Sequence, residues 1–228
     1  MVARFPTLNI VDPSWSPITP NYDIGWKDTA LDLIEECGRV SHRSEDRVRE
    51  GTAEKFIRGV AIRRGHESIL RHSNFTALII GSRAMSHQLV RHSVGITFTQ
   101  ESMRYCDYSR EGKKLSVVIP PSISVNADLR LSFLLECGRQ YDTYCQFIGK
   151  YSDTVVAPED ARYLLPHATA TTVYATANYQ AWRHFIHMRN DAHAQWEIRE
   201  IAKQAYEFFK ENVPVLMEGL KDFSGNDL

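Results

Sequence analysis

Two stretches of the chain hold most of the residue types that do chemistry. One starts at Arg91 and His92 and continues through residues 100–105, which read Gln-Glu-Ser-Met-Arg-Tyr, and the other covers residues 188–197. Both place basic and amide side chains among apolar neighbours. A charged group kept from water needs a partner, because unpaired burial costs on the order of several kcal/mol. The two stretches therefore predict a site for an anionic ligand.

Arginine side chains are the first candidates for holding that anion. A guanidinium offers five donors in a planar fork, which suits a carboxylate, a phosphate or the edge of a uracil ring. Convergence of several arginines would indicate a nucleotide, and the candidates are Arg91, Arg104, Arg162 and Arg189. Residues four apart share a helix face. If a helix begins early enough, Arg189 and His193 therefore point into one cavity and Glu197 extends the row, and His87 and Arg91 are related in the same way.

Composition limits the class of protein. The chain has 228 residues, of which 43% are hydrophobic and 24% charged, and its net charge is -1. These values are typical of a folded globular protein and disfavour a disordered chain or a dedicated binder of nucleic acid polymers. No apolar run reaches the roughly 20 residues that span a membrane, and the first ten residues lack a signal peptide's apolar centre. We expect one domain over residues 1–228 in the cytoplasm.

The four cysteines are scattered without metal-binding spacing. Cys37, Cys106, Cys137 and Cys145 are interpreted as reduced thiols and not as a disulfide framework or a zinc site. Cys106 follows the first stretch, where Arg104 would lower its pKa. Because no histidine is close in sequence to act as its base, an inert thiol is the preferred interpretation.

The elements that position these residues are predicted from periodicity and end signals. The N-terminal segment 1–25 is expected to be an irregular arm or an edge strand. The first half otherwise predicts helices 28–38, 52–64 and 82–90, the last capped by Ser82, and strands 75–80 and 114–119. The second half is predicted to be mainly helical, with helices 127–151, 158–165 and 192–209. On the last helix, Glu197 and Arg199 are expected to face out.

Separated segments of the chain resemble the flavin-dependent thymidylate synthase family. Gly65 to Ser68 with His72 is similar to the family's GHES/T segment, and Gln88 to His92 is similar to the start of its RHRxxSxNxxSxR signature. The similarity extends from about Gly38 to Phe223. Agreement of separated segments in the right order is much more specific than a lone Arg-His pair.

The resemblance implies a fold, a reaction and an assembly. The fold is expected to be α/β, with a small central sheet, long helices and a predominantly helical C-terminal half. The expected reaction is the methylation of dUMP to dTMP, with methylenetetrahydrofolate as carbon donor and FAD as redox carrier reduced by NADPH. The expected assembly is a homotetramer that shares its sites between subunits, with no membrane or nucleic acid polymer as partner.

The resemblance also assigns roles to residues. Arg189 matches the catalytic arginine that engages the uracil edge and makes C5 a better nucleophile by electrostatic activation. Positions that hold dUMP are matched by Gln88, Arg91, Gln100, Glu101, Ser102, Met103, Arg104, Arg162 and Arg189. Positions that contact FAD are matched by Ser68, Arg91, His92, Ser93, Gln100, Asn178, Gln180, His184 and His193, and His66 matches a histidine near the flavin and folate stack. No metal ligand is expected.

The chain departs from the family pattern inside the signature. Ser93 replaces its second arginine, and the spacing from Arg91 to Ser102 is one residue longer than the common one. Thr99 stands where asparagine is frequent, Gln180 where arginine is usual, and His184 where asparagine is usual. Loss of two guanidinium groups is expected to weaken FAD binding by on the order of a few kcal/mol, unless Arg183 or another cation replaces them.

Structural roles and other classes of protein remain open alternatives. Arg91 and Arg104 could pair with Glu101 or Asp107 at the surface. His66, His72, His87 and His92 could be hydrogen-bonded structural histidines, while Trp196 fits the core and Glu197 the surface. A metal-dependent hydrolase would use histidine pairs such as His184 with His187, or His66 with His72, although no HExxH motif is present. A catalytically impaired relative would bind dUMP without flavin or turnover.

Overall fold

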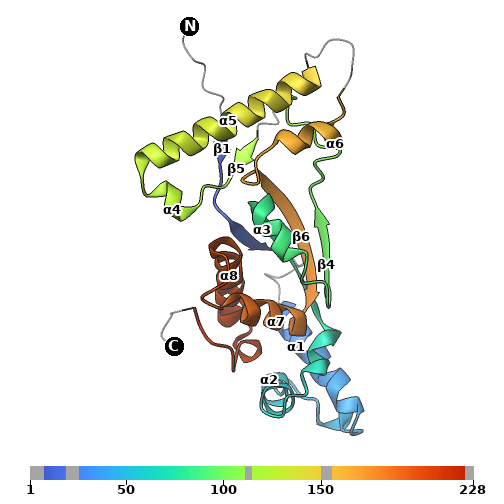
Figure 1. The fold of residues 1–228 in the computed structure, drawn as a ribbon. Coiled ribbons are helices and arrows are strands. Elements are labelled where there is room, and N and C mark those ends of the chain that lie inside the picture. Colours follow the sequence, from blue (N-terminus) through green and yellow to red (C-terminus); the bar gives the residue numbers. More distant parts are fainter. Residues whose placement is uncertain (1–7, 19–25, 111–114, 150–155, 224–228) are drawn as a thin grey trace. The chain divides into compact units, whose positions relative to one another are not determined.

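The computed structural model describes residues 8–18, 26–110, 115–149 and 156–223 (Figure 1). Its contacts form two compact units, each assembled from three separate stretches of chain. Unit 1 contains the described residues within 1–13, 80–88 and 100–173, and unit 2 those within 14–79, 89–99 and 174–228. The single domain expected from the sequence stays a prediction.

Two sheets are present in the described part of the chain. One pairs β1 (Asn9–Ile10) in parallel with β5 (Ser116–Val117), and Asn9 lies opposite Ser116. The other has four strands in the order β2 (Ser14–Pro17), β3 (Asn74–Ser82), β6 (Ala170–Asn178) and β4 (Ile96–Gln100). The predicted α/β class with a small sheet is confirmed. Residues 14–17 form an edge strand, the second alternative for the N-terminal segment, whose residues 1–7 and 19–25 lie outside the described residues.

Strands β3 and β6 form the longest part of the four-stranded sheet. Phe75, Ala77 and Ile79 of β3 are buried in alternation with partly exposed neighbours, which is the two-residue period of a strand. In β6 the same alternation buries small side chains, among them Val173 and Ala175. The prediction of a mainly helical second half missed β6, because alanines and threonines give a weak contrast between buried and exposed positions. Strand β4 was not predicted either.

Unit 2 carries the helices α1 (Trp26–Val40), α2 (Ala53–Ile57), α7 (Tyr179–Arg189) and α8 (Trp196–Asn212). Helix α1 packs against α2, and α7 packs against α8. A π-helical turn at Arg58–Ile62 continues α2, and 3₁₀ turns lie at Glu45–Arg47, Glu67–His72 and Pro214–Leu216. The helices predicted at 28–38, 52–64 and 192–209 are confirmed in type, whereas α7 was not predicted.

Aromatic side chains fill the core of unit 2. Trp15 stacks on Phe75 with ring centroids 5.8 Å apart and meets Trp182 edge-on at 6.0 Å. The indole N–H of Trp182 donates to the carbonyl oxygen of Phe75 at 3.1 Å, so its polar edge is satisfied inside the core. Phe209 of α8 contacts the same rings. This cluster fixes α7 and α8 against the sheet.

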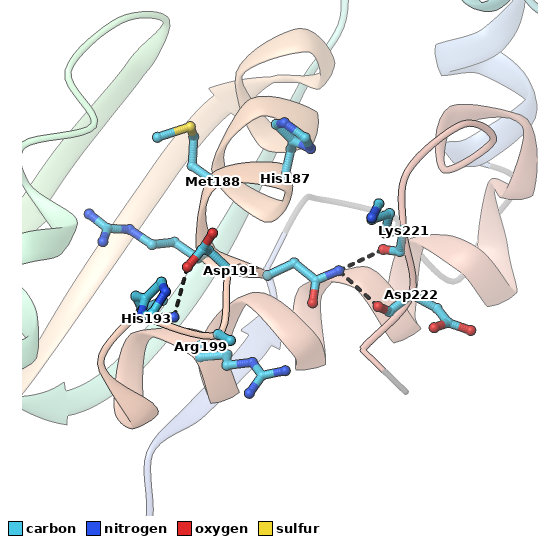
Figure 2. Close-up of a pocket in the computed structure, with 11 residues that line it drawn as sticks. His187, Met188, Asp191, His193, Arg199, Lys221 and Asp222 are labelled. Carbon is cyan, nitrogen blue, oxygen red and sulfur yellow. Dashed lines mark hydrogen bonds between the residues drawn. The ribbon is translucent and has the colours of Figure 1, made fainter. Parts of the chain in front are cut away.

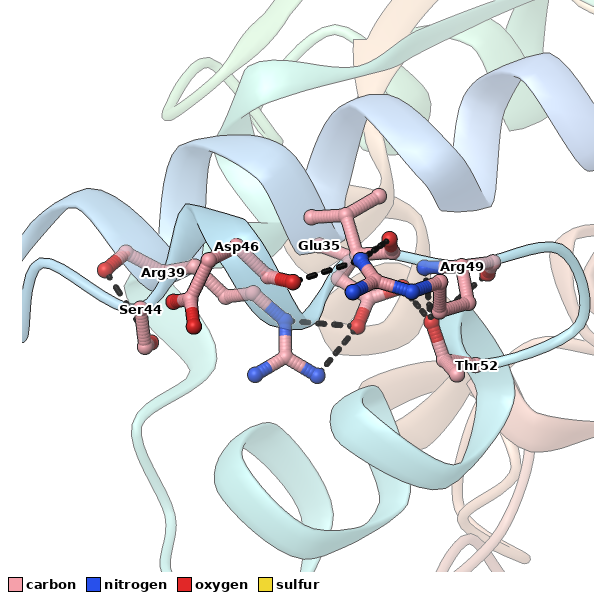
Figure 3. Close-up of polar contacts among 7 residues, drawn as sticks. Glu35, Arg39, Ser44, Asp46, Arg49 and Thr52 are labelled. Carbon is pink, nitrogen blue, oxygen red and sulfur yellow. Dashed lines mark hydrogen bonds and ion pairs between the residues drawn. The ribbon is translucent and has the colours of Figure 1, made fainter.

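A buried carboxylate joins α1 to the start of α2 (Figure 3). Glu35 is fully buried and accepts hydrogen bonds from Nε of Arg39 and from Oγ1 of Thr52, each at 2.7 Å. The Arg39 guanidinium also lies over the Phe56 ring, 4.7 Å from its centroid. Burial of this charge is tolerated because both carboxylate oxygens have partners. The network positions the segment that leads into 65–72.

Unit 1 carries the helices α3 (Arg83–Leu89), α4 (Pro121–Ser124), α5 (Ala127–Gly149) and α6 (Pro158–Ala161), although Leu89 itself belongs to unit 2. The predicted cap is confirmed, because Oγ of Ser82 accepts the Met85 backbone N–H at 3.0 Å. Helix α3 ends before Val90. The prediction that His87 and Arg91 share a helix face is therefore wrong.

The remaining predicted elements of unit 1 are shorter than expected. The strand expected at 114–119 is limited to β5, and residue 114 lies outside the described residues. The helix expected at 127–151 is α5, and residues 150 and 151 are likewise outside. The helix expected at 158–165 becomes α6 followed by a 3₁₀ turn at Arg162–Leu164.

Unit 1 has a tyrosine-rich core under α5. The Tyr144 hydroxyl accepts the Tyr108 backbone N–H at 3.2 Å, and the Tyr141 hydroxyl donates to the Tyr108 carbonyl at 2.7 Å. All four cysteines are free thiols, and burial raises the pKa of Cys137 to about 11. None of the helices in the described ranges is both long and apolar enough to cross a bilayer.

Candidate functional site: two cavities lined by arginine

The first candidate site is a cavity of about 470 Å³ within unit 1, which we call the Arg162 cavity. It brings together two residues predicted for dUMP, Met103 and Arg162, with Arg83, His87 and His167. Met103 is buried and supplies an apolar wall. Guanidinium and imidazole groups beside an apolar wall suit the phosphate and the sugar or base of a nucleotide.

Backbone hydrogen bonds hold the polar side chains at this cavity. The Arg83 N–H donates to the Thr169 carbonyl at 2.9 Å, and the Ala84 N–H donates to the His167 carbonyl at 3.1 Å. Nε of Arg162 donates to the Glu159 carbonyl at 2.9 Å. Within the described ranges, neither Arg83 nor Arg162 forms an ion pair with a carboxylate. Both guanidinium groups therefore keep charge for a ligand.

Residues 100–104 run from the end of β4 into a turn and are hydrogen-bonded to β6. The Glu101 N–H donates to the Thr172 carbonyl at 2.9 Å, and the Glu101 carboxylate accepts the Tyr108 hydroxyl at 2.9 Å. Gln100 donates to Thr171, and Oγ of Ser102 accepts the Arg104 backbone N–H. The half-exposed Arg104 pairs with Glu159 at 3.0 Å, and not with Glu101 or Asp107.

The second candidate site is a cavity of about 580 Å³ within unit 2, which we call the Arg189 cavity (Figure 2). Two predicted site residues, Arg189 and His193, line it. They are joined by His187, Arg199 and Lys221 among other residues. No ion pair neutralises Arg189 within the part of the chain that the structure describes. The cavity thus presents positive charge in a chain whose net charge is -1.

Arg189 and His193 line one cavity, but the secondary structure that positions them differs from the predicted helix. Arg189 is the last residue of α7, and α8 begins at Trp196 after a turn. Gln195 caps α8 by accepting backbone N–H groups of its first turn at 3.2 Å. The prediction that both side chains lie four apart on one helix is wrong, because a helix end and a turn separate them. The expected surface residue Glu197 is only 2% exposed.

His92 is the direct partner of Arg189. Nε of Arg189 donates to Nε2 of His92 at 2.9 Å, and the His92 ring meets Phe185 edge-on with centroids 5.1 Å apart. Burial, the Arg189 charge and the nearby His184 lower the pKa of His92 to about 4. A neutral imidazole with a free Nε2 lone pair can accept this bond, whereas an imidazolium cannot. His92 therefore orients the guanidinium.

This contact predicts a pH dependence of stability. Between pH 6.5 and about 4 the unfolded chain binds a proton at His92 that the folded chain does not, so the free energy of unfolding should fall as pH falls through this window. Chemical denaturation at pH 7, 6, 5 and 4.5 measures the slope. His92→Gln, which keeps an acceptor but does not titrate, should reduce the slope. An unchanged slope would show that other groups cause it.

A glycine supports the turn after His92. Gly95 has a φ of 75°, and its carbonyl accepts the Asn178 N–H at 3.3 Å. A Cβ at Gly95 would lie 2.8 Å from the Asn178 side-chain nitrogen. The Asn178 side chain in turn caps α7 by accepting the Ala181 N–H at 2.9 Å. This turn therefore couples the signature segment to the start of α7.

The other residues predicted for flavin line neither cavity. Those that are exposed are His66, Ser68, Arg91, Ser93 and His184. Gln180 accepts a hydrogen bond from Nε of Arg71. Arg183 was expected to be able to replace a missing flavin cation, but it is 6% exposed and donates to the Leu216 and Glu218 carbonyls and to Glu67. That expectation is wrong.

The sequence reasoning missed several residues that line the cavities. Arg83 and His167 were not singled out, and Arg199 was placed on the outer face of its helix, whereas it is half-buried at the Arg189 cavity. Lys221 gave no signal, because it follows the last helix. Among the described residues, no three His, Cys, Asp or Glu side chains lie close enough to hold a metal ion, so the hydrolase alternative lacks a candidate site there.

Fold and site together define an α/β protein with two cavities lined by cationic side chains. The sequence matches the family described as thymidylate synthase complementing protein over residues 25–215. The flavin-dependent thymidylate synthase of Pyrococcus furiosus is 37% identical over 171 residues, which cover 75% of this chain and 68% of that protein. The enzyme of Corynebacterium diphtheriae is 32% identical over 234 residues, with coverages of 94% and 90%. The chain therefore belongs to the flavin-dependent thymidylate synthase family, as its sequence predicted.

Solved structures share the fold. The UMP/dUMP methylase PolB of Streptomyces cacaoi, bound with 5-Br dUMP, gives a TM-score of 0.71 at 22% identity and covers 92% of this chain and 96% of that one. Thymidylate synthase X of Helicobacter pylori, with FAD and dUMP, gives a TM-score of 0.66 at 16% identity, with coverages of 91% and 97%. At these identities the similarity establishes the architecture, which agrees with the predicted fold class.

Proposed function

We propose that the chain converts dUMP to dTMP as a flavin-dependent thymidylate synthase, with methylenetetrahydrofolate as carbon donor and NADPH as reductant of FAD. The observation that supports this most is Arg189, the position that the family resemblance assigns to uracil, standing at a cavity wall without a carboxylate partner in the described residues. We expect the enzyme to work in the cytoplasm.

The proposed role of Arg189 follows from its charge and shape. A guanidinium fork at the uracil edge stabilises negative charge near N3, and this makes C5 a better carbon nucleophile. His92 holds the fork by accepting its Nε–H, so the donors face the ligand without reorganisation. Arg162 and Arg83 are proposed to bind a phosphate group in the Arg162 cavity. Binding and electrostatic activation are thus the tasks of this chain's own residues.

The residues predicted for FAD fit a phosphate-bearing cofactor. Arg91 exposes a guanidinium that has no partner among the described residues, and Arg71 is held by the neutral amide of Gln180. Each of these guanidinium groups suits a phosphate, although Arg71 was not among the residues predicted for FAD. When bound, FAD supplies the reducing electrons for the transferred carbon. Ser68, Asn178 and His184 are proposed to orient it.

The decisive experiment follows the visible absorption of purified protein supplied with FAD. We expect flavin bands that bleach on anaerobic addition of NADPH, faster with dUMP than without, and dTMP after addition of methylenetetrahydrofolate. UMP is run beside dUMP, and each product is identified by chromatography. Failure to bind flavin, with dUMP binding retained, would favour a catalytically impaired relative. Sedimentation of the same sample tests the proposed homotetramer.

A further inference from the structure

The Arg189 cavity contains a second set of cations that the family resemblance does not assign. Arg199 of α8 and Lys221 of the C-terminal segment line it. Figure 2 shows Lys221 on the opposite side of the cavity from His193, with Arg199 at its lower edge. Neither Arg199 nor Lys221 is among the residues predicted to bind dUMP or flavin, although both line the cavity with Arg189 and His193.

Counted together with Arg189, the charges of this region are only partly balanced by carboxylates. Neither Arg199 nor Lys221 forms an ion pair within the part of the chain that the structure describes. Two carboxylates also line the cavity, and one of them, Asp191, accepts the backbone N–H of His193 at 2.7 Å. With Arg189 included, three permanent cations face two carboxylates. Such a concave, cationic surface attracts anions.

The wall that carries Lys221 is fixed by hydrogen bonds. The side-chain amide of Asn190, at the end of α7, donates to the Lys221 carbonyl at 2.8 Å and to the Asp222 carbonyl at 2.9 Å. Arg199 is half-buried in the first turn of α8, where its backbone N–H donates to Gln195 at 3.1 Å. A wall that is already ordered binds a ligand at a smaller entropic cost.

We propose that Arg199 and Lys221 form an anion subsite that binds a multivalent oxyanion carried by a co-substrate. The guanidinium fork fits a carboxylate or a phosphate, and the ammonium adds a point charge. Two sources share this chemistry, the glutamyl carboxylates of the folate and the phosphates of NADPH. The choice between these sources rests on the proposed function, whereas anion binding itself does not.

The first test is titration calorimetry on the full chain with two probes, γ-linked triglutamate and pyrophosphate. Arg199→Gln and Lys221→Gln should each weaken the binding of at least one probe about tenfold, equivalent to about 1.4 kcal/mol. Lys203→Gln is the matched control, because Lys203 lies on the same helix with a 44% exposed side chain 3.9 Å from Glu207. Unchanged affinities in both variants, or no binding to the unmodified protein, would overturn the proposal.

The second test identifies the source of the anion. If the KM for triglutamylated methylenetetrahydrofolate rises in both variants while that for the monoglutamate changes little, the folate tail occupies the subsite. A rise in the KM for NADPH alone assigns it to the reductant. Unchanged KM values for both would refute a co-substrate role. A chain that binds the probes but never forms dTMP would refute the proposed function and leave the subsite intact.

Discussion

Replacing Arg189 with alanine should lower kcat for dTMP formation by roughly 10²- to 10³-fold, the usual effect of removing one donor aimed at developing charge. The guanidinium is aimed by His92 at 2.9 Å and has no carboxylate partner in the described residues. Its loss therefore removes stabilisation of the reacting uracil. The substitution does not leave a buried carboxylate unpaired, because Arg189 has no carboxylate partner among the described residues. Flavin content and thermal stability should change little.

Single-turnover formation of dTMP measures the effect, together with the flavin-to-protein absorbance ratio and the melting temperature. Arg189→Lys keeps the charge but not the fork, so it should recover only a small part of the rate. Arg110→Ala is the control, because that side chain is 74% exposed and pairs with Asp107 in unit 1. A kcat within threefold of the unmodified enzyme would refute the role of Arg189.

Replacing Arg183 with alanine should lower the free energy of unfolding by about 3 kcal/mol, because the change leaves buried groups without donors. The Arg183 guanidinium reaches the carbonyls of Leu216 and Glu218 and pairs with Glu67 at 3.1 Å. The Glu67 and Glu218 ends are partly open to water, with side chains 35% and 36% exposed, whereas the contact with Leu216 is buried. The segment after α8 should therefore loosen.

Denaturant unfolding measures the loss, with Arg139→Ala as a control. Arg139 pairs with Glu136 on the exposed face of α5, so its removal should cost less than about 1 kcal/mol. The two variants also test the site. If Arg183→Ala lost flavin while keeping its unfolding free energy, Arg183 would be a flavin ligand after all, and the structural role argued above would be wrong.

Helices with large apolar side chains were the most predictable part of the fold. Ile198, Ile201 and Phe209 of α8 are all fully buried, as their spacing predicts. The cap at Ser82 was predictable too, because a serine hydroxyl just before a helix commonly accepts a backbone N–H of the first helical turn. Strand β6 was missed because its buried positions, Thr171, Val173, Ala175 and Ala177, carry small side chains that contrast little in polarity with their neighbours, although threonine and valine favour a strand.

The arginines of the site could be named from the sequence, but the sequence could not show which of them pair with a carboxylate. Arg104 and Arg183 resemble Arg189 in the sequence, yet the fold pairs Arg104 with Glu159 and Arg183 with Glu67. These partners lie 55 and 116 positions away. Only tertiary structure decides which guanidinium stays available. The bond between His92 and Arg189 spans 97 positions and was beyond periodicity arguments for the same reason.

The way in which the chain is divided between its units has a consequence for synthesis on the ribosome. The backbone N–H of Trp15 in β2 donates to the side chain of Gln204 in α8, 189 positions later. The aromatic core of unit 2 therefore cannot close until α8 has been translated. Until then Trp15 and Phe75 lack the rings of Trp182 and Phe209 that cover them. We expect nascent chains stalled before α7 to be targets of chaperones and proteases.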